Sequence, residues 1–121
     1  MTCRLALALV LLPTVSFAEP RAGDVVFDAA GLDAHLSGQV MEFYDGSKSR
    51  YDADHRYGYT YTDDGPVWAG EWRTEADSRV CVDFDNGSSR CDHIVLDGAR
   101  TVLIIADGTR FPVRTISDIT E

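Results

Sequence analysis

The sequence predicts a mainly β fold, an antiparallel up-and-down meander of about eight strands that forms a small barrel or half-barrel, with one short N-terminal helix. Two observations predict it. Asp-Gly and Asn-Gly dipeptides, which suit tight hairpins because glycine tolerates positive φ, recur after residue 38. The last three lie 11 and 10 residues apart, which is room for one strand and one turn. Connections this short force neighbouring strands to be antiparallel.

Residues 1–18, MTCRLALALVLLPTVSFA, are predicted to be a cleaved signal peptide. Arg4 supplies a positive start, Leu5 to Leu12 form an apolar run, and small residues end at Ala18. The run is too short for a permanent membrane helix, and a buried N-terminal helix is the alternative. We therefore expect one β-rich domain over residues 19–121, secreted to the periplasm or the extracellular space.

The expected mature chain is an acidic protein. Without Arg4, 10 basic residues face 20 acidic ones, so the formal net charge is −10. Such a chain repels nucleic acid and anionic membrane surfaces. The longest later apolar run, Val102 to Ala106, is too short to span a membrane. We therefore predict no nucleic-acid partner and no membrane span in the mature chain.

The first element is a short helix at about residues 28–37, DAAGLDAHLS. Asp28 can accept hydrogen bonds from the free N–H groups of the first turn. Leu32 and Leu36 fall at helical spacing, and Gly38 is a natural terminator. We expect this helix to plug or flank one end of the sheet.

The meander follows at about residues 39–115. The first two gaps between glycine turns are about twice as long as the later ones, so we expect further turns at 52–55 and 75–78. Pro112 complicates closure of the sheet, because proline cannot donate to a ladder and prefers an edge. The expected strands span residues 39–44, 48–52, 56–62, 67–74, 79–84, 88–96, 101–106 and 110–115.

The stretch RVCVDFDNGSSRCDH, residues 79–93, contains two cysteines, three of the acidic residues and a histidine. Its Cys-x9-Cys-x-His spacing matches no common zinc pattern. An EF-hand loop starting at Asp83 would need glycine at position 6 and glutamate at position 12, where the chain has Ser88 and Ile94. A Cys-x-x-Cys redox motif is absent from the sequence. We predict no metal site and no cofactor.

A β-hairpin whose two strands are joined by a disulfide fits the same stretch. With a two-residue loop at Asn86-Gly87, Cys81 faces Asp92. With a three-residue loop ending in Gly87 at the left-handed position of a bulge, Cys81 lies directly opposite Cys91. Opposed Cβ atoms are about 4.5–5.5 Å apart, and closer in non-hydrogen-bonded pairs, which brings a disulfide within reach. An oxidising compartment favours this bond, so we predict a Cys81–Cys91 disulfide.

Two of the expected strands carry aromatic residues at period two. RYGYTYTDDG places three tyrosines on one face, and VWAGEWR places two tryptophans on one face with Gly70 between them. Aromatic faces can bind ligands, and core packing is the alternative for both strands. The glycine can relieve crowding at a bend of the barrel. If a ligand pocket exists, its candidate lining residues are Tyr59, Tyr61, Trp68 and Trp72.

Groups suited to catalysis are few. Asp52, Asp54 and His55 lie together, but the chain has no Gly-x-Ser-x-Gly elbow to expose a nucleophile. We assign no catalytic residue, and the sequence favours a protein that is not an enzyme. The alternative is a small envelope hydrolase that uses His55 with Asp52 or Asp54 as acid–base groups.

The order of the motifs resembles a family of small secreted, periplasmic alphaproteobacterial proteins described as a domain of unknown function. The matching positions are a Leu-x-Gly start at Leu36 to Gly38, a Gly-x-Trp strand at Gly70 to Trp72, and the pair Cys81 and Cys91. The resemblance covers roughly residues 28–115. It implies a periplasmic β-rich domain and carries no active site onto any position.

Taken together, we expect a monomer that acts as a non-enzymatic binding or interaction module. Its partner would be a small apolar ligand or an envelope protein. Besides the hydrolase, a protein inhibitor that occupies a partner's cleft through a loop or a sheet edge is a further alternative.

Overall fold

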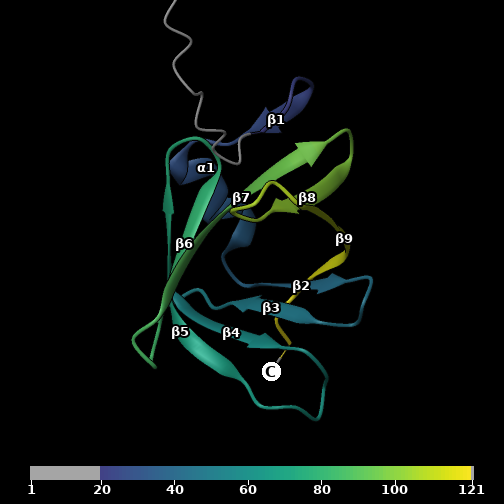
Figure 1. The fold of residues 1–121 in the computed structure, drawn as a ribbon. Helices are drawn as coiled ribbons and strands as arrows, with labels where there is room; N and C mark the ends of the chain where they lie inside the picture. Colours follow the sequence, from purple (N-terminus) through teal and green to yellow (C-terminus); the bar gives the residue numbers. More distant parts are fainter. Residues whose placement is uncertain (1–19, 121) are drawn as a thin grey trace, which may run out of the picture.

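The barrel is closed. A computed structural model describes residues 20–120, so the predicted signal peptide lies outside the described residues. Within this range eight antiparallel strands follow one another around the barrel, and the last of them, β9, pairs with the first, β2 (Figure 1). The elements are β1 (Asp24–Val26), α1 (Ala29–Leu36), β2 (Gln39–Phe43), β3 (Lys48–Tyr51), β4 (Arg56–Thr60), β5 (Trp68–Glu75), β6 (Arg79–Phe84), β7 (Ser89–Asp97), β8 (Arg100–Ile104) and β9 (Arg110–Asp118).

The predicted meander is confirmed, with one strand added to it. Strand β1 lies outside the expected strands, and it pairs with β7 at Val95 to Asp97, beyond the β6–β7 pair of Arg79 with His93. Asp24 in β1 also accepts two hydrogen bonds of 2.8 Å from Arg110 in β9. The ion pair thus joins β1, which lies beside β7, to β9, which lies beside β8.

Pro112 does not prevent closure. It lies opposite Val102 in β8, and the pairing of β9 with β2 reaches only to Val113. The N–H of Ile105 donates to the carbonyl of Thr109, and alternation along the ladder then leaves Pro112 in a non-hydrogen-bonded pair. The missing N–H therefore costs no ladder bond on either side.

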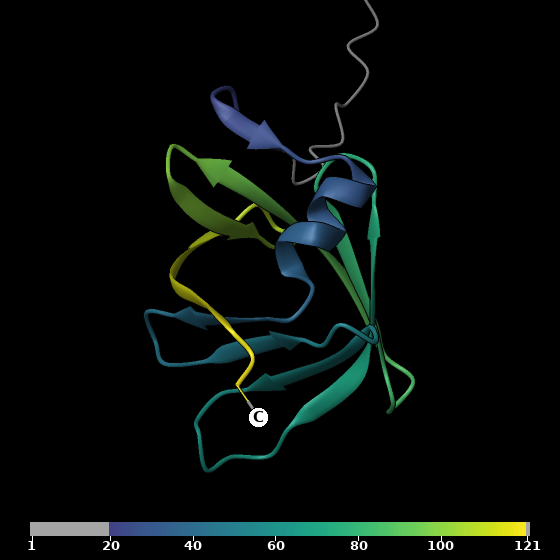
Figure 2. The ribbon, with the colours of Figure 1, turned by 180° about the vertical axis from the view of Figure 1, so that it is seen from behind.

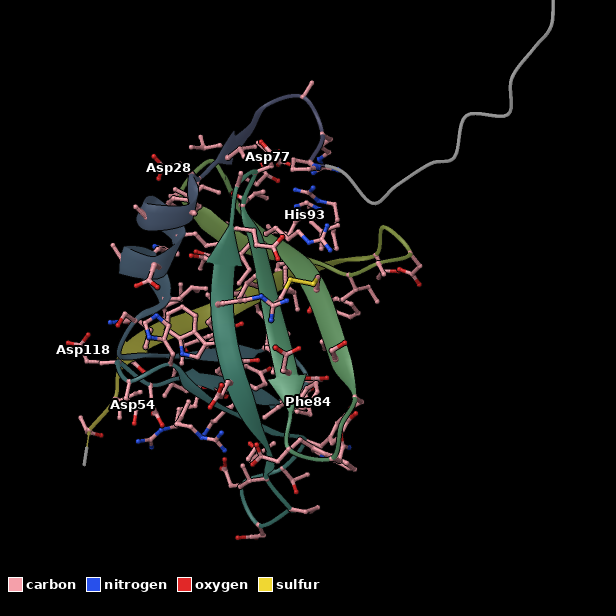
Figure 3. All side chains as sticks on the ribbon, turned by 90° about the vertical axis from the view of Figure 1, so that its left-hand side faces the viewer. Asp28, Asp54, Asp77, Phe84, His93 and Asp118 are labelled. Atoms are coloured by element: carbon pink, nitrogen blue, oxygen red, sulfur yellow. A yellow bond between two sulfur atoms is a disulfide. The ribbon has the colours of Figure 1, made fainter. Side chains whose placement is uncertain are left out.

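The hairpin between β6 and β7 has the predicted register. The N–H of Phe84 donates to Ser88, the N–H of Gly87 donates back to Phe84, and Gly87 has a φ of 90°. Cys81 lies directly opposite Cys91, and the two form a disulfide that joins the strands (Figure 3). The β2–β3 and β8–β9 turns repeat this three-residue loop.

Helix α1 fills one end of the barrel. Asp28 caps it by accepting a 2.7 Å hydrogen bond from the N–H of Gly31, as predicted. Leu32 and Leu36 are fully buried, and the helix packs against β5, β2 and β6 (Figure 2). No helix in residues 20–120 is long and apolar enough to cross a membrane. The core that the helix completes comprises Leu32, Leu36, Met41, Phe43, Tyr51, Tyr57, Trp72, Val80, Val82, Ile94 and Val113.

The two ends of the barrel are formed by different sets of turns. In an up-and-down meander alternate turns share an end, so the turns after β3, β5 and β7 lie at the end that α1 covers. The turns after β2, β4, β6 and β8 surround the opposite end, which we call the open end.

Candidate functional site

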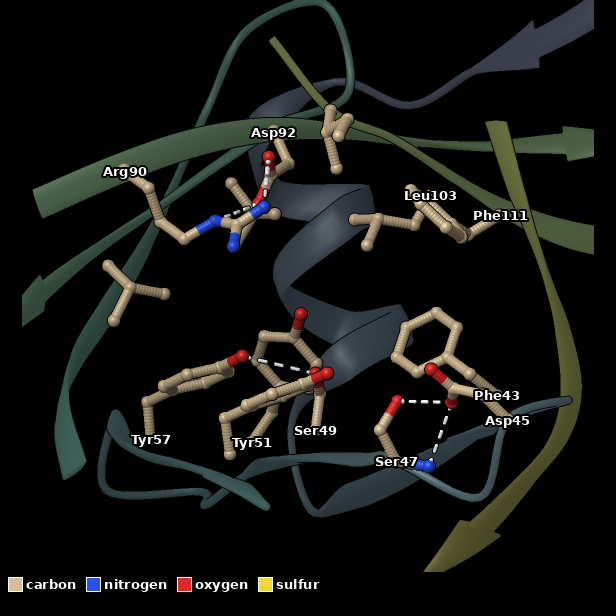
Figure 4. A pocket seen from close by; sticks show the side chains of 14 residues that line it. Phe43, Asp45, Ser47, Ser49, Tyr51, Tyr57, Arg90, Asp92, Leu103 and Phe111 are labelled. Carbon is tan, nitrogen blue, oxygen red and sulfur yellow. Dashed lines mark hydrogen bonds and ion pairs between the residues drawn. The ribbon is translucent and has the colours of Figure 1, made fainter. Parts of the chain in front are cut away.

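A cavity of about 220 Å³ occupies the barrel interior toward the open end (Figure 4). Residues of seven strands, all except β1 and β5, line it together with the adjoining turns. Aromatic rings make up much of its wall, with aliphatic side chains from β6 and β8 between them. The aromatic and aliphatic lining residues are Phe43, Tyr51, Tyr57, Tyr59, Val80, Val82, Leu103, Ile105 and Phe111.

A charged pair lies among these apolar walls. Arg90 and Asp92 are two residues apart on β7 and therefore face the same side, into the barrel. The Arg90 Nε and Nη2 atoms donate to the two Asp92 carboxylate oxygens at 2.8 and 2.9 Å. The Asp92 side chain is 11% exposed and that of Arg90 is 47% exposed. Hydrogen bonding to Asp92 raises the pKa of Arg90, and the two side chains form an ion pair inside the barrel.

Two tyrosines form the polar floor below this pair. The hydroxyls of Ser49 and Tyr57 are 3.1 Å apart, and both residues are buried. Burial raises the pKa of Tyr57 to about 12 and that of Tyr51 well above its ordinary value. Both phenols therefore stay protonated at neutral pH, and each can donate or accept a hydrogen bond.

Asp45 borders the cavity at the open end, where it serves the β2–β3 turn. Its Oδ1 atom accepts hydrogen bonds from the Ser47 N–H at 2.9 Å and the Ser47 hydroxyl at 2.6 Å. These bonds hold the pKa of Asp45 below its usual value, so it carries a negative charge at neutral pH. Asn86 makes the same contacts with Ser88 in the β6–β7 turn. The first role of Asp45 is thus to shape its turn.

The aromatic strands meet in a second hollow of about 250 Å³ at the rim of the open end. Tyr59, Tyr61 and Trp68 all line it, with Tyr59 directly opposite Trp68 across the β4–β5 ladder. The rings of Tyr59 and Tyr61 are 4.9 Å apart in an edge-on arrangement. The rim hollow shares Tyr57, Tyr59 and Arg90 with the inner cavity, so the two spaces are neighbours.

Trp72, the fourth residue predicted for a pocket, lies elsewhere. It is 2% exposed and belongs to the core beneath α1. Its indole N–H donates to the carbonyl of Asp52 at 3.0 Å, and its ring meets that of Tyr51 edge-on at 5.5 Å. Trp68 and Trp72 share one face of β5, but they lie at opposite ends of the barrel.

Arg90 and Asp92 were not singled out from the sequence, although a signal for them exists. The register that pairs Cys81 with Cys91 also places Arg90 opposite Val82 and Asp92 opposite Val80. Two charged residues then stand on the core-facing side of a strand. Charges at such positions are seldom buried unless they are paired, so the pattern marks an unusual interior.

His55 lies at the covered end, on the turn between β3 and β4. Its Nε2 atom is 2.7 Å from the Asp33 carboxylate on α1, and its ring packs 4.5 Å from that of Trp72. Asp52 instead accepts a 2.6 Å bond from Arg50, and Asp54 accepts from the backbone N–H of Arg56. The carboxylate partner of His55 is therefore a helix residue, and the contact ties α1 to the turn.

Residues 20–120 contain no group of three or more His, Cys, Asp or Glu side chains placed to hold a metal ion. Comparison of the chain with protein-family models, with curated proteins and with solved structures finds no match. The function must therefore be inferred from the chemistry of the cavity.

Proposed function

We propose that the protein is a non-enzymatic binding module that takes a small, largely apolar ligand into the open end of its barrel. One observation carries the proposal: the interior is filled by α1 and its core at one end and is hollow at the other. Eight-stranded barrels have interiors that are either filled by side chains or hold one small ligand. In this barrel, side chains and α1 fill one end of the interior, and the other end has room for a ligand.

The lining of the cavity supports this function. Ligand sites are mostly apolar, with a few polar groups that fix the orientation of the bound molecule. Here the polar groups are the Arg90–Asp92 pair and the hydroxyls of Ser49, Tyr51 and Tyr57. Their neighbours Val80 and Val82 are aliphatic, so a ligand would be held mainly by apolar contact.

The proposal includes a place of action in the periplasm or outside the cell. The Cys81–Cys91 disulfide supports it, because such bonds form and persist in oxidising compartments. The acidic composition of the chain fits a partner other than nucleic acid.

NMR titration with uncharged single-ring aromatics, beginning with benzamide, tests the proposal. We expect saturable shifts of the backbone amides of Val80 and Val82. The variant Leu103→Trp, which fills the cavity from β8, should lose these shifts. The control Val25→Trp, at a position 53% exposed on β1, should keep them.

Two results would contradict the proposal. One is the absence of saturable shifts in the wild-type protein. The other is a set of shifts that survives in Leu103→Trp, since the ligand would then bind outside the barrel.

A further inference from the structure

We infer that the cavity selects a single-ring aromatic molecule whose polar head is an uncharged hydrogen-bond acceptor, such as an amide carbonyl, and that it discriminates against a carboxylate. The inference rests on the proposed function, because it concerns what the same cavity holds. It follows from three properties of the cavity: its volume, the kind of polar group it presents, and the balance of charge around that group.

The volume limits the ligand to about one ring. A dry cavity of ~150 Å³ lined by aliphatic and aromatic side chains is large enough for benzene. The inner cavity of about 220 Å³ therefore has room for a ring and a small head group. Phe43 and Phe111 stand on one side of it, and Tyr57 and Arg90 on the other (Figure 4).

Arg90 dictates that the head must accept hydrogen bonds. A guanidinium has five N–H donors and no acceptor, and Asp92 takes one donor from Nε and one from Nη2. Among residues 20–120 no side chain or backbone atom is hydrogen-bonded to the third nitrogen, Nη1. Figure 4 shows it on the side of the cavity that faces Tyr57 and Tyr51. An oxygen of the ligand placed there would satisfy it.

The charge balance argues against an anionic head. Asp92 already neutralises Arg90 through two hydrogen bonds, so a carboxylate at Nη1 would meet the repulsion of Asp92 beside the attraction of Arg90. The anion would still lose its hydration, which is costly unless a full opposite charge compensates it. The ionised Asp45 at the open end adds further repulsion. An unpaired arginine would show the reverse preference, because it binds carboxylates through two parallel hydrogen bonds.

Benzamide and benzoate test the inference, because they have nearly the same shape and differ in charge. Isothermal titration at pH 7 should show wild-type protein binding benzamide at least about tenfold more tightly than benzoate, because only benzoate loses the hydration of a full charge without an unpaired opposite charge to compensate it. Asp92→Asn keeps the shape of the side chain and frees the charge of Arg90. In that variant the preference should reverse toward benzoate.

Arg90→Gln gives a second variant, which is decisive even where Asp92→Asn does not fold. It should weaken benzamide binding by about tenfold, since the donor at Nη1 is lost. Wild-type protein that binds benzoate as tightly as benzamide, or Arg90→Gln that binds benzamide unchanged, would overturn the inference and leave ligand binding intact. Failure of the wild type to bind either compound in the cavity would overturn the proposed function itself.

Discussion

Replacement of Gly70 by alanine should destabilise the barrel, because β5 and β6 approach too closely there to admit a side chain. Gly70 faces Phe84 across the ladder. A Cβ atom at position 70 would lie 2.4 Å from the Asp83 carbonyl oxygen and 2.9 Å from the Phe84 Cα atom. These are backbone atoms of a paired strand, so no change of rotamer can relieve the contact.

The size of the effect follows from the displacement required. Ordinary contact begins at 3.4 Å, so β6 must move about 1 Å from β5 at this point. Extra atoms in a well-packed core cost about 1–3 kcal/mol, and we take the middle of that range because a single atom is added. We expect the free energy of unfolding to fall by about 2 kcal/mol. For a domain of this size that lowers Tm by about 8–16 °C.

Urea unfolding followed by circular dichroism measures the loss, and Gly58→Ala is a matched control. Gly58 is also in a strand, and a Cβ atom there meets one side-chain atom, Val67 Cγ1, at 3.2 Å. Because that side chain can turn aside, Gly58→Ala should change stability by less than about 0.5 kcal/mol. A Gly70→Ala variant as stable as Gly58→Ala would refute the close approach of β5 and β6.

Three further predictions concern fixed contacts of the fold. Reduction of the disulfide between Cys81 and Cys91, which are 10 residues apart, should lower the free energy of unfolding by about 2.7 kcal/mol, because the unfolded chain gains the entropy of an open loop. Urea unfolding with and without reductant measures this loss, and an unchanged stability after verified reduction would contradict it. Burial raises the pKa of Tyr57 from 10.0 to about 12, so the unfolded state loses its proton first and stability should fall as pH rises through this interval. Tyr57→Phe should show a smaller fall in alkaline unfolding experiments, and an unchanged fall would speak against a buried, protonated phenol. Hydrogen bonds from Arg110 hold the pKa of Asp24 below its usual value. Their contribution to the free energy of unfolding is therefore complete above about pH 4, and it is lost as pH falls through the folded-state pKa. Asp24→Asn should therefore be less stable at pH 7 and lose less stability on acidification, as acid titrations followed by fluorescence would show; an acid transition identical to the wild type would rule out this role.

Local chemistry accounts for the parts of the fold that the sequence predicts well. The hairpin from Cys81 to Cys91 is set by one residue, Gly87, whose positive φ fixes a three-residue loop and hence every pair along the two strands. The helix is set by the Asp28 cap and two leucines. In each case the determining residues lie within one element or its turn.

Non-local contacts account for what the sequence does not predict. Strand β1 is three residues long and is held by the edge of β7 and by an arginine 86 residues away. The partner of His55, Asp33, comes from the helix, 22 residues earlier in the chain. Period-two spacing assigns Trp68 and Trp72 to the same face, but it contains no information on depth along the barrel axis. That depth separates a rim residue that is 46% exposed from a core residue that is 2% exposed.

The central claim is that the open end of the barrel is a binding site organised by Arg90. A crystal structure of the wild-type protein grown with saturating benzamide tests it most directly. We predict the ring inside the barrel against Phe111 and Val82, with the carbonyl oxygen about 2.7–3.2 Å from Arg90 Nη1. An empty interior, or benzamide bound only on the outer surface, would contradict the claim.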